Sequence, residues 1–270
     1  MTTNHSSTTR TVAIVSAVIG GVVLLAVGGA ALLAVTQSLF RPESSAHQTL
    51  SVPTDGVTQL SVDSHSAHVT VQFDDVPEAV LDVSGERASD WRLTNRHGEL
   101  KVDKDTWWLG GFCFIACWGD RTDVTLTLPE DLNDGRMDAG FDIASGEVSA
   151  TGRFDALEID LASGSIDFDG SARTFNGGVA SGDARLAVDS PDEFRVDVAS
   201  GNVEAAVTGS TPRSVEVDIA SGDVQLTLPD AEYRYSQDIA SGNVRNDLRT
   251  SPTAKASVDV KVASGNVTLR

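Results

Sequence analysis

The chain has 270 residues, of which 40% are hydrophobic and 22% are charged, and its formal net charge is −19 at pH 7. One continuous domain of this size is normal for an all-β protein and can bury a large core. The negative charge argues against a nucleic-acid-binding protein, because such proteins carry a basic surface.

Residues 11–40 carry no charge, and Thr11 to Val35 consist mainly of Val, Ala, Leu, Ile and Gly. A helix of about 25 such residues crosses a hydrocarbon core about 30 Å thick. The apolar run of a cleavable signal peptide is shorter, at about 7–15 residues. The sequence therefore predicts a transmembrane helix over residues 11–40, after a cytoplasmic tail (1–10) and before a tether (41–50).

The orientation of this helix is not fixed by charge, because Arg10 and Arg41 flank it on opposite sides. The short tail before the span and the large acidic region after it favour an N-terminus inside the cell. We therefore expect a single-pass cell-membrane protein whose bulk is extracytoplasmic. Ala17 and Gly21 are four residues apart and suit packing against another helix, although such spacings also arise by chance in Ala/Gly-rich spans.

Residues 51–137 contain shorter segments of strand-like alternation, beginning at Leu60–Val62 and Val69–Phe73. We expect these segments to form irregular N-terminal β coils and a cap. An aromatic loop over residues 103–123 interrupts the alternation and holds Trp107, Trp108, Phe112, Phe114 and Trp118. Such a cluster is typical of a membrane or partner contact. The alternative is a lid that covers the hydrophobic core of the β-domain.

Cys113 and Cys117 lie in the same loop and are the only cysteines of the chain. In an oxidising compartment they are predicted to form a local disulfide. Zinc is disfavoured because no further ligands cluster near them, and a redox-active pair is the remaining alternative.

Residues 138–270 contain seven copies of Ala-Ser-Gly whose serines are separated by 18, 18, 19, 21, 20 and 23 residues. A period near 20 indicates a repeat architecture. Strict alternation of apolar and polar residues on both sides of each copy indicates two strands joined by a corner, where Gly permits a tight turn. The predicted corner residues are Ser145, Gly146, Ser163, Gly164, Ser181, Gly182, Ser200, Gly201, Ser221, Gly222, Ser241, Gly242, Ser264 and Gly265.

Two architectures fit these repeats, a parallel β-solenoid and a meander of hairpins. The solenoid is favoured, because parallel stacking about 4.8 Å apart places identical corners directly above one another. The last strand, Val267–Arg270, follows the last corner without a capping segment. We therefore expect an open sheet edge there, which is either blunted locally or used for self-association.

Stacking also places acidic residues in a column three positions before the corner serines, and neighbouring carboxylates repel one another. Solvation and nearby arginines such as Arg185 and Arg195 relieve this repulsion in one interpretation, and a calcium ion relieves it in the other. The calcium candidates are Asp142, Asp160, Asp197, Asp218 and Asp238. No other metal and no cofactor is predicted.

The sequence predicts a non-enzymatic protein. It contains no Gly-x-Ser-x-Gly, phosphate-loop or His-Glu-x-x-His motif, and every histidine lies at or before His97, outside the regular repeats. No catalytic residue is therefore assigned. A carboxylate-based glycan-active enzyme remains an alternative, because paired acids are abundant.

The region from about residue 50 to residue 270 resembles the bacterial "putative-adhesin" domain family of unknown function. The resemblance rests on the Gly98-centred turn, the strand ending in Leu128-Pro129, and above all the repeated Ser-Gly-Asp/Asn-Val corners. It implies a right-handed parallel β-helix outside the membrane and brings no catalytic residues.

Together these features predict a membrane-anchored, adhesin-like binding or structural module of the cell envelope. The expected partners are the membrane, a cell-wall polymer or another envelope protein, with self-association through the C-terminal edge or the anchor helix. The alternative is an accessory component of an envelope-stress sensing or signalling system.

Overall fold

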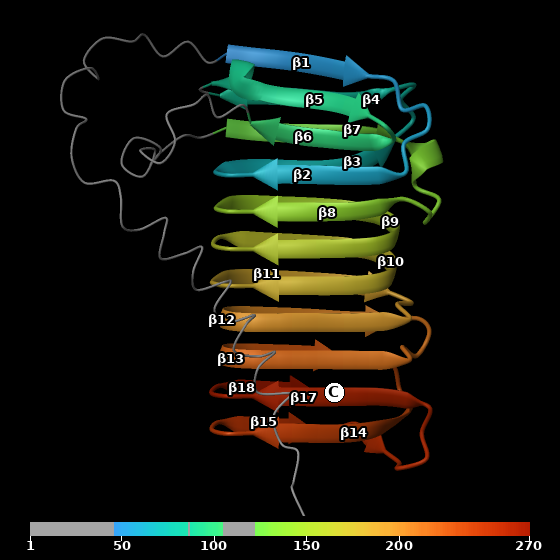
Figure 1. The fold of residues 1–270 in the computed structure, drawn as a ribbon, viewed down its shortest axis with the longest axis vertical. Coiled ribbons are helices and arrows are strands. Elements are labelled where there is room, and N and C mark those ends of the chain that lie inside the picture. The colour runs from blue at the N-terminus through green and yellow to red at the C-terminus, as the bar shows by residue number, and fades with distance from the viewer. Residues whose placement is uncertain (1–45, 86, 105–121) are drawn as a thin grey trace, which may run out of the picture. The chain divides into compact units, whose positions relative to one another are not determined.

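The computed structural model describes residues 46–85, 87–104 and 122–270, which form β-strands joined by turns and two short 3-10 helices (Figure 1). Residues 44–105 and 120–270 belong to one compact unit. All the described strands and their continuous hydrophobic core lie in this unit. A fragment of residues 44–270 therefore contains every described strand and the whole described core.

Each Ala-Ser-Gly corner joins two strands on opposite sides of the core. We call the layer before the corners the pre-corner sheet and the layer after them the post-corner sheet. The pre-corner sheet contains β2 (Gln59–Ser64), β8 (Asp138–Ile143), β14 (Glu232–Ile239) and β17 (Ala256–Val262). The post-corner sheet contains β3 (Ala67–Asp74), β11 (Gly182–Asp189), β15 (Asn243–Asn246) and β18 (Asn266–Leu269). Four long strands contribute to both sheets: β9 (Gly146–Leu161), β10 (Ser165–Val179), β12 (Glu193–Thr208) and β13 (Ser214–Thr227).

The coils stack in parallel, with like residues over like. Ile166 pairs with Val148 on one side and with Ala184 on the other. The same register continues from Val203 to Val224 and Val267. The structure is therefore a solenoid-like all-β fold and not a meander of hairpins, as the repeated corners predicted.

Alternate side chains of every coil point into the core between the two sheets. Val, Ile and Leu fill most of this space, and the rings of Phe175 and Phe194 stack with centroids 4.8 Å apart. The intervening residues point outward, so each coil presents a repeated row of polar side chains on each sheet. This alternation makes the outer surface a regular array.

The order of the coils in space departs from the order in the chain at the C-terminal end. The coil of β17 and β18 lies between that of β13 and that of β14 and β15, as Figure 1 shows at the bottom of the stack. The expectation that Val267–Arg270 forms the open edge was therefore wrong. The connection through β16 (Arg249–Thr250) leads the chain back, so the sixth repeat is outermost.

The N-terminal end is built differently. Here β1 (Ala46–Val52) pairs antiparallel with β4 (Ala79–Gly85), which pairs antiparallel with β7 (Thr122–Pro129). On the other sheet, β5 (Trp91–Arg96) pairs antiparallel with β6 (Glu99–Lys104). The 3-10 helix η1 (Ala88–Asp90) precedes β5, and η2 (Glu130–Leu132) follows β7. The coil of β2 and β3 is inserted between β6/β7 and β8/β9.

Candidate binding surface

The corner glycines form one continuous column through the stack. Gly164, for example, has a φ of +112°, and a Cβ there would collide with the backbone carbonyl of Gly146 in the neighbouring coil. The same close approach links Gly146, Gly164, Gly182, Gly201, Gly222, Gly265 and Gly242, in that spatial order. Only glycine tolerates both the left-handed backbone and the missing space.

The seven corner serines are all exposed beside this column. They are Ser145, Ser163, Ser181, Ser200, Ser221, Ser241 and Ser264. Ala67 occupies the place of the corner glycine in the preceding coil, against Gly146. The structure thus gives the glycines of the repeat a packing role.

The acidic column of the pre-corner sheet is partly neutralised by two basic side chains. Arg195 donates to Asp197 at 2.8 Å and to Glu216 at 2.5 Å, and its Nη2 lies 3.5 Å from Asp218. Lys261 takes the place of an aspartate in the column and lies 2.8 Å from Glu216 and 3.3 Å from Asp218. The hydrogen bond from Arg195 to Asp197 raises the pKa of the guanidinium despite partial burial. Asp197 and Asp218 are therefore held by side-chain cations, although burial still raises the pKa of Asp218.

The first coils of the same column are less well neutralised. Lys101 lies 2.8 Å from Asp63, but burial and the charges of Asp63 and Asp160 raise the pKa of Asp142. Burial, followed by the charge of Glu158, raises the pKa of Asp160. Gly178 replaces the next aspartate, and a Cβ at this position would lie 2.7 Å from Oδ1 of Asp160. This glycine leaves room for the Asp160 carboxylate.

The calcium candidates Asp142, Asp160, Asp197, Asp218 and Asp238 lie in one column, but they do not converge on a point. Asp142 and Asp160 face one another in adjacent coils, whereas Gly178 separates Asp160 from Asp197 and Lys261 separates Asp218 from Asp238. Within the three described ranges, no group of three or more His, Cys, Asp or Glu side chains is arranged to hold a metal ion.

The post-corner sheet carries a hydrogen-bonded ladder of amides and carboxylates. Nδ2 of Asn202 donates to Asp183 at 2.9 Å, and Nδ2 of Asn266 donates to Asp223 at 2.7 Å. Asn243 extends the ladder by donating to Asn266 at 3.2 Å. The alternation of Asp and Asn at this position relieves repulsion, because each amide can donate to a neighbouring carboxylate. The sequence contained this signal, but its role as a ladder depends on the coil order.

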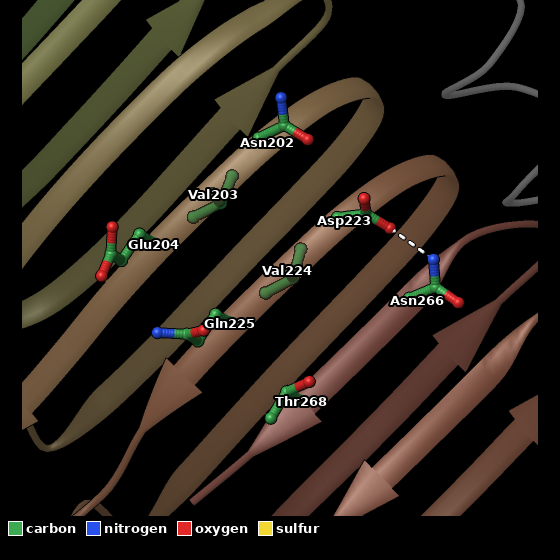
Figure 2. A pocket seen from close by; sticks show the side chains of 8 residues that line it. All are labelled: Asn202, Val203, Glu204, Asp223, Val224, Gln225, Asn266 and Thr268. Carbon is green, nitrogen blue, oxygen red and sulfur yellow. Dashed lines mark hydrogen bonds between the residues drawn. The ribbon is translucent and has the colours of Figure 1, made fainter.

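A shallow groove of about 320 Å³ runs between this ladder and the row of outward-facing side chains two positions further along each strand. Figure 2 shows Asn202, Asp223 and Asn266 along one side and Glu204, Gln225 and Thr268 along the other. Val203 and Val224 lie between these rows and are buried. Each of the three coils along the groove therefore contributes two polar side chains, which together offer carboxylate, amide and hydroxyl groups. The groove can accept and donate hydrogen bonds to an extended polar ligand.

Several predicted features lie outside the described residues. They are the transmembrane helix over 11–40 with Ala17 and Gly21, the cysteines Cys113 and Cys117, and the aromatic residues Trp107, Trp108, Phe112, Phe114 and Trp118. Among the residues that the structure does describe, no helix has the length and apolar character to span a membrane.

Parallel coils stacked on a glycine column define a solenoid-like repeat protein. A family model described as Toastrack DUF4097 matches residues 49–270, and the chain belongs to this family. No curated protein matches the chain.

Several solved structures are similar to this chain. A "putative adhesin" from Bacteroides fragilis is 14% identical, with 84% of this chain and 99% of that chain covered and a TM-score of 0.46. A "putative lipid binding protein" from Parabacteroides distasonis is 14% identical, with 84% and 98% covered and a TM-score of 0.40. A "putative cell adhesion protein" from Clostridium sporogenes is 11% identical, with 84% and 99% covered and a TM-score of 0.37.

Proposed function

We propose that this protein is a membrane-anchored, extracytoplasmic and non-enzymatic binding module of the cell envelope, resembling an adhesin. In this proposal residues 11–40 form the transmembrane anchor, and the coils wind as a right-handed parallel β-helix outside the membrane. The proposed ligand is a cell-wall polymer that lies along the groove of the post-corner sheet.

The regular polar groove carries this proposal. Asn202, Asp223 and Asn266 repeat at the coil spacing of about 4.8 Å, so the groove offers an amide or carboxylate contact at each of the three coils that line it. A polymer with regularly spaced hydroxyl, amide or amino groups can meet several of these contacts at once. Each hydrogen bond contributes little by itself, because water competes for both partners. Many bonds along one strand of polymer give useful avidity.

The acidic side chains of the groove define the chemistry further. Glu204 and Asp223 add negative charge, whereas Asn202, Gln225 and Thr268 are neutral. A wall polymer with free amino groups is therefore a better fit than an anionic one, because opposite charges attract across the contact. The aromatic loop over 103–123 is assigned to the membrane or to a protein partner.

The proposal is tested by co-sedimentation of residues 44–270 with purified cell walls and, separately, with liposomes. The fragment starts before β1, which begins at Ala46. Glu204→Lys in the groove is expected to reduce wall binding, whereas Asn176→Ala, an exposed position of the pre-corner sheet, is the matched control and is expected to leave it unchanged. Wall binding that is insensitive to Glu204→Lys would overturn the assignment of the groove.

Substitution of Trp107, Trp108 and Trp118 by Ala separates the membrane contact from the wall contact. Liposome binding that is lost in this variant assigns the aromatic loop to the membrane surface. Absence of binding to both walls and liposomes would contradict the adhesin-like function. It would favour the alternative of an accessory protein in envelope-stress sensing, in which the partner is another membrane protein.

A further inference from the structure

The coil of β14 and β15 ends the stack with one sheet edge unoccupied by the other described strands. Ala240 donates its backbone N–H inward to Val262, and Asn243 donates inward to Gly265. Because backbone groups alternate in direction along a strand, those of Tyr235, Gln237 and Ile239 point outward from the stack. Among the described strands, only β16 pairs with β14 on this side, at Glu232 and Tyr233.

Tyr233 of this coil is buried, but its other core-facing apolar side chains are only partly buried. Ile239 aligns with Val262, which is 2% exposed, and Val244 aligns with Val267, which is 1% exposed. Ile239, Val244, Tyr235 and Leu248 are instead partly exposed at the end of the core. The edge therefore combines free backbone groups with uncovered apolar surface, which is the combination that pairs with another strand.

The distribution of charge along the chain favours this end for contact with a second copy. Residues 130–227 contain 20 Asp and Glu against 6 Arg, whereas residues 228–270 contain 5 Asp and Glu against 6 Lys and Arg. Two copies of a chain with a net charge of −19 repel one another over the acidic coils. The repulsion is weakest where the C-terminal coils meet, because this region is nearly neutral.

We propose that this edge pairs with the same edge of a second copy, with β14 antiparallel to β14 of the partner. The outward-pointing backbone groups restrict the register to a few choices. One of them pairs Tyr235 with the partner's Gln237 by two backbone hydrogen bonds, and its twofold symmetry repeats that pair. In this register Arg234 lies opposite the partner's Asp238, as a non-hydrogen-bonded pair whose side chains approach closely.

The twofold arrangement also covers the open core. The half-exposed side chains of the two copies meet across the new strand pair, so the two cores become continuous. A strand from an unrelated protein could satisfy the backbone groups. Such a strand would place an acidic residue opposite Arg234, a basic residue opposite Asp238 and an apolar surface against the end of the core only by coincidence. A second copy supplies all three, because the twofold axis places Asp238 of one chain opposite Arg234 of the other.

The inference is tested by sedimentation equilibrium of residues 44–270, with far-UV circular dichroism to verify folding. The wild-type fragment is expected to dimerise reversibly. Gln237→Pro removes an outward N–H without breaking the inward ladder, and it is expected to give a monomer. Gln237→Ala keeps that N–H, is the matched control, and is expected to dimerise.

A charge-swap experiment tests the register. Arg234→Asp and Asp238→Arg each place like charges opposite one another in the dimer, so each is expected to weaken self-association about tenfold or more. A mixture of the two variants restores opposite charges at both sites and is expected to form heterodimers. A monomeric wild-type fragment, a dimer that survives Gln237→Pro, or a mixture that stays monomeric would each overturn the proposal. None of these outcomes depends on wall binding, so the proposed function is tested separately.

Discussion

The two ends of the solenoid differ in how they terminate the same core. At the N-terminal end, antiparallel strands and η1 close the stack, and Trp91 is completely buried. At the C-terminal end, the core-facing side chains Ile239 of β14 and Val244 of β15 are only partly buried. Both ends are made of strands with similar alternation. The chain connections, and not the composition of the coils, therefore decide which end is closed.

The two ends differ because the chain supplies additional strands to cover the core at one end and, among the described strands, only the short β16 at the other. At the N-terminal end the chain doubles back several times before the regular repeats begin, which provides strands for a cap. At the other end the seventh repeat inserts inside the sixth. This insertion buries the last strand of the chain and leaves the sixth repeat with only the two-residue strand β16 on its outer side among the described strands.

The largest expected effect on stability comes from removing the side chain of Trp91, which is buried at the closed N-terminal end. Trp91→Ala is expected to lower the free energy of unfolding by about 3–5 kcal/mol, because it leaves a large cavity in a fully packed end. Ile239→Ala at the open end is expected to cost about 1 kcal/mol, because that side chain is only partly buried. Urea unfolding of the two variants measures both, and equal losses would contradict the contrast between the ends.

The glycine column provides the second comparison. Gly201→Ala introduces a Cβ against the carbonyl of Gly182 at a φ of +149° and is expected to cost about 2–4 kcal/mol. Gly242→Ala meets a similar obstruction, but the outermost coil is free to shift outward, so about half that loss is expected. Gly135→Ala is the control for backbone strain alone, because its φ is +76° and no atom lies within 4 Å. A larger loss of thermal stability for Gly242→Ala than for Gly201→Ala would contradict this account.

The salt-bridge network gives a smaller effect. Arg195→Gln leaves the carboxylate of Asp197 without its cation and Glu216 with Lys261 alone, and it is expected to cost about 1 kcal/mol at low salt. Added salt is expected to reduce this loss by screening. Arg245→Gln at the open end removes a single exposed pair with Asp247 and is expected to change stability by less than about 0.5 kcal/mol. Melting curves at two salt concentrations test both statements.

The smallest effect is a gain in stability. Burial raises the pKa of Asp160, so the folded state holds a proton more strongly than the unfolded state. Stability is therefore lost as the pH rises from the ordinary carboxyl pKa through the raised value. Asp160→Asn is expected to stabilise the protein at pH 7 by less than about 1 kcal/mol, with no gain near about pH 3. Asp238→Asn is the control at the open end, and an equal gain there would contradict the role of burial.

The repeat itself was readable from the sequence, because the Ala-Ser-Gly copies and the alternation around them recur at a nearly constant period. Parallel stacking followed from the identity of the corners, and the column from Gly146 to Gly265 gives its physical reason. The location of the open edge was predicted incorrectly. Sequence order gives no information on the insertion of β17 and β18, because all the repeats present compatible surfaces to one another.

The candidate surface was only partly predictable. The outward positions of Asp223 and Asn266 follow from alternation, but these two residues are 43 positions apart and became neighbours only through the inserted coil. The same applies to Lys261, which lies beside Asp218 and Glu216. The sequence by itself determined the strands, the inward and outward faces and the corners, because these depend on the local period and on glycine. Only the tertiary structure decided the order of the coils and the open end, because these depend on contacts between coils far apart in the chain.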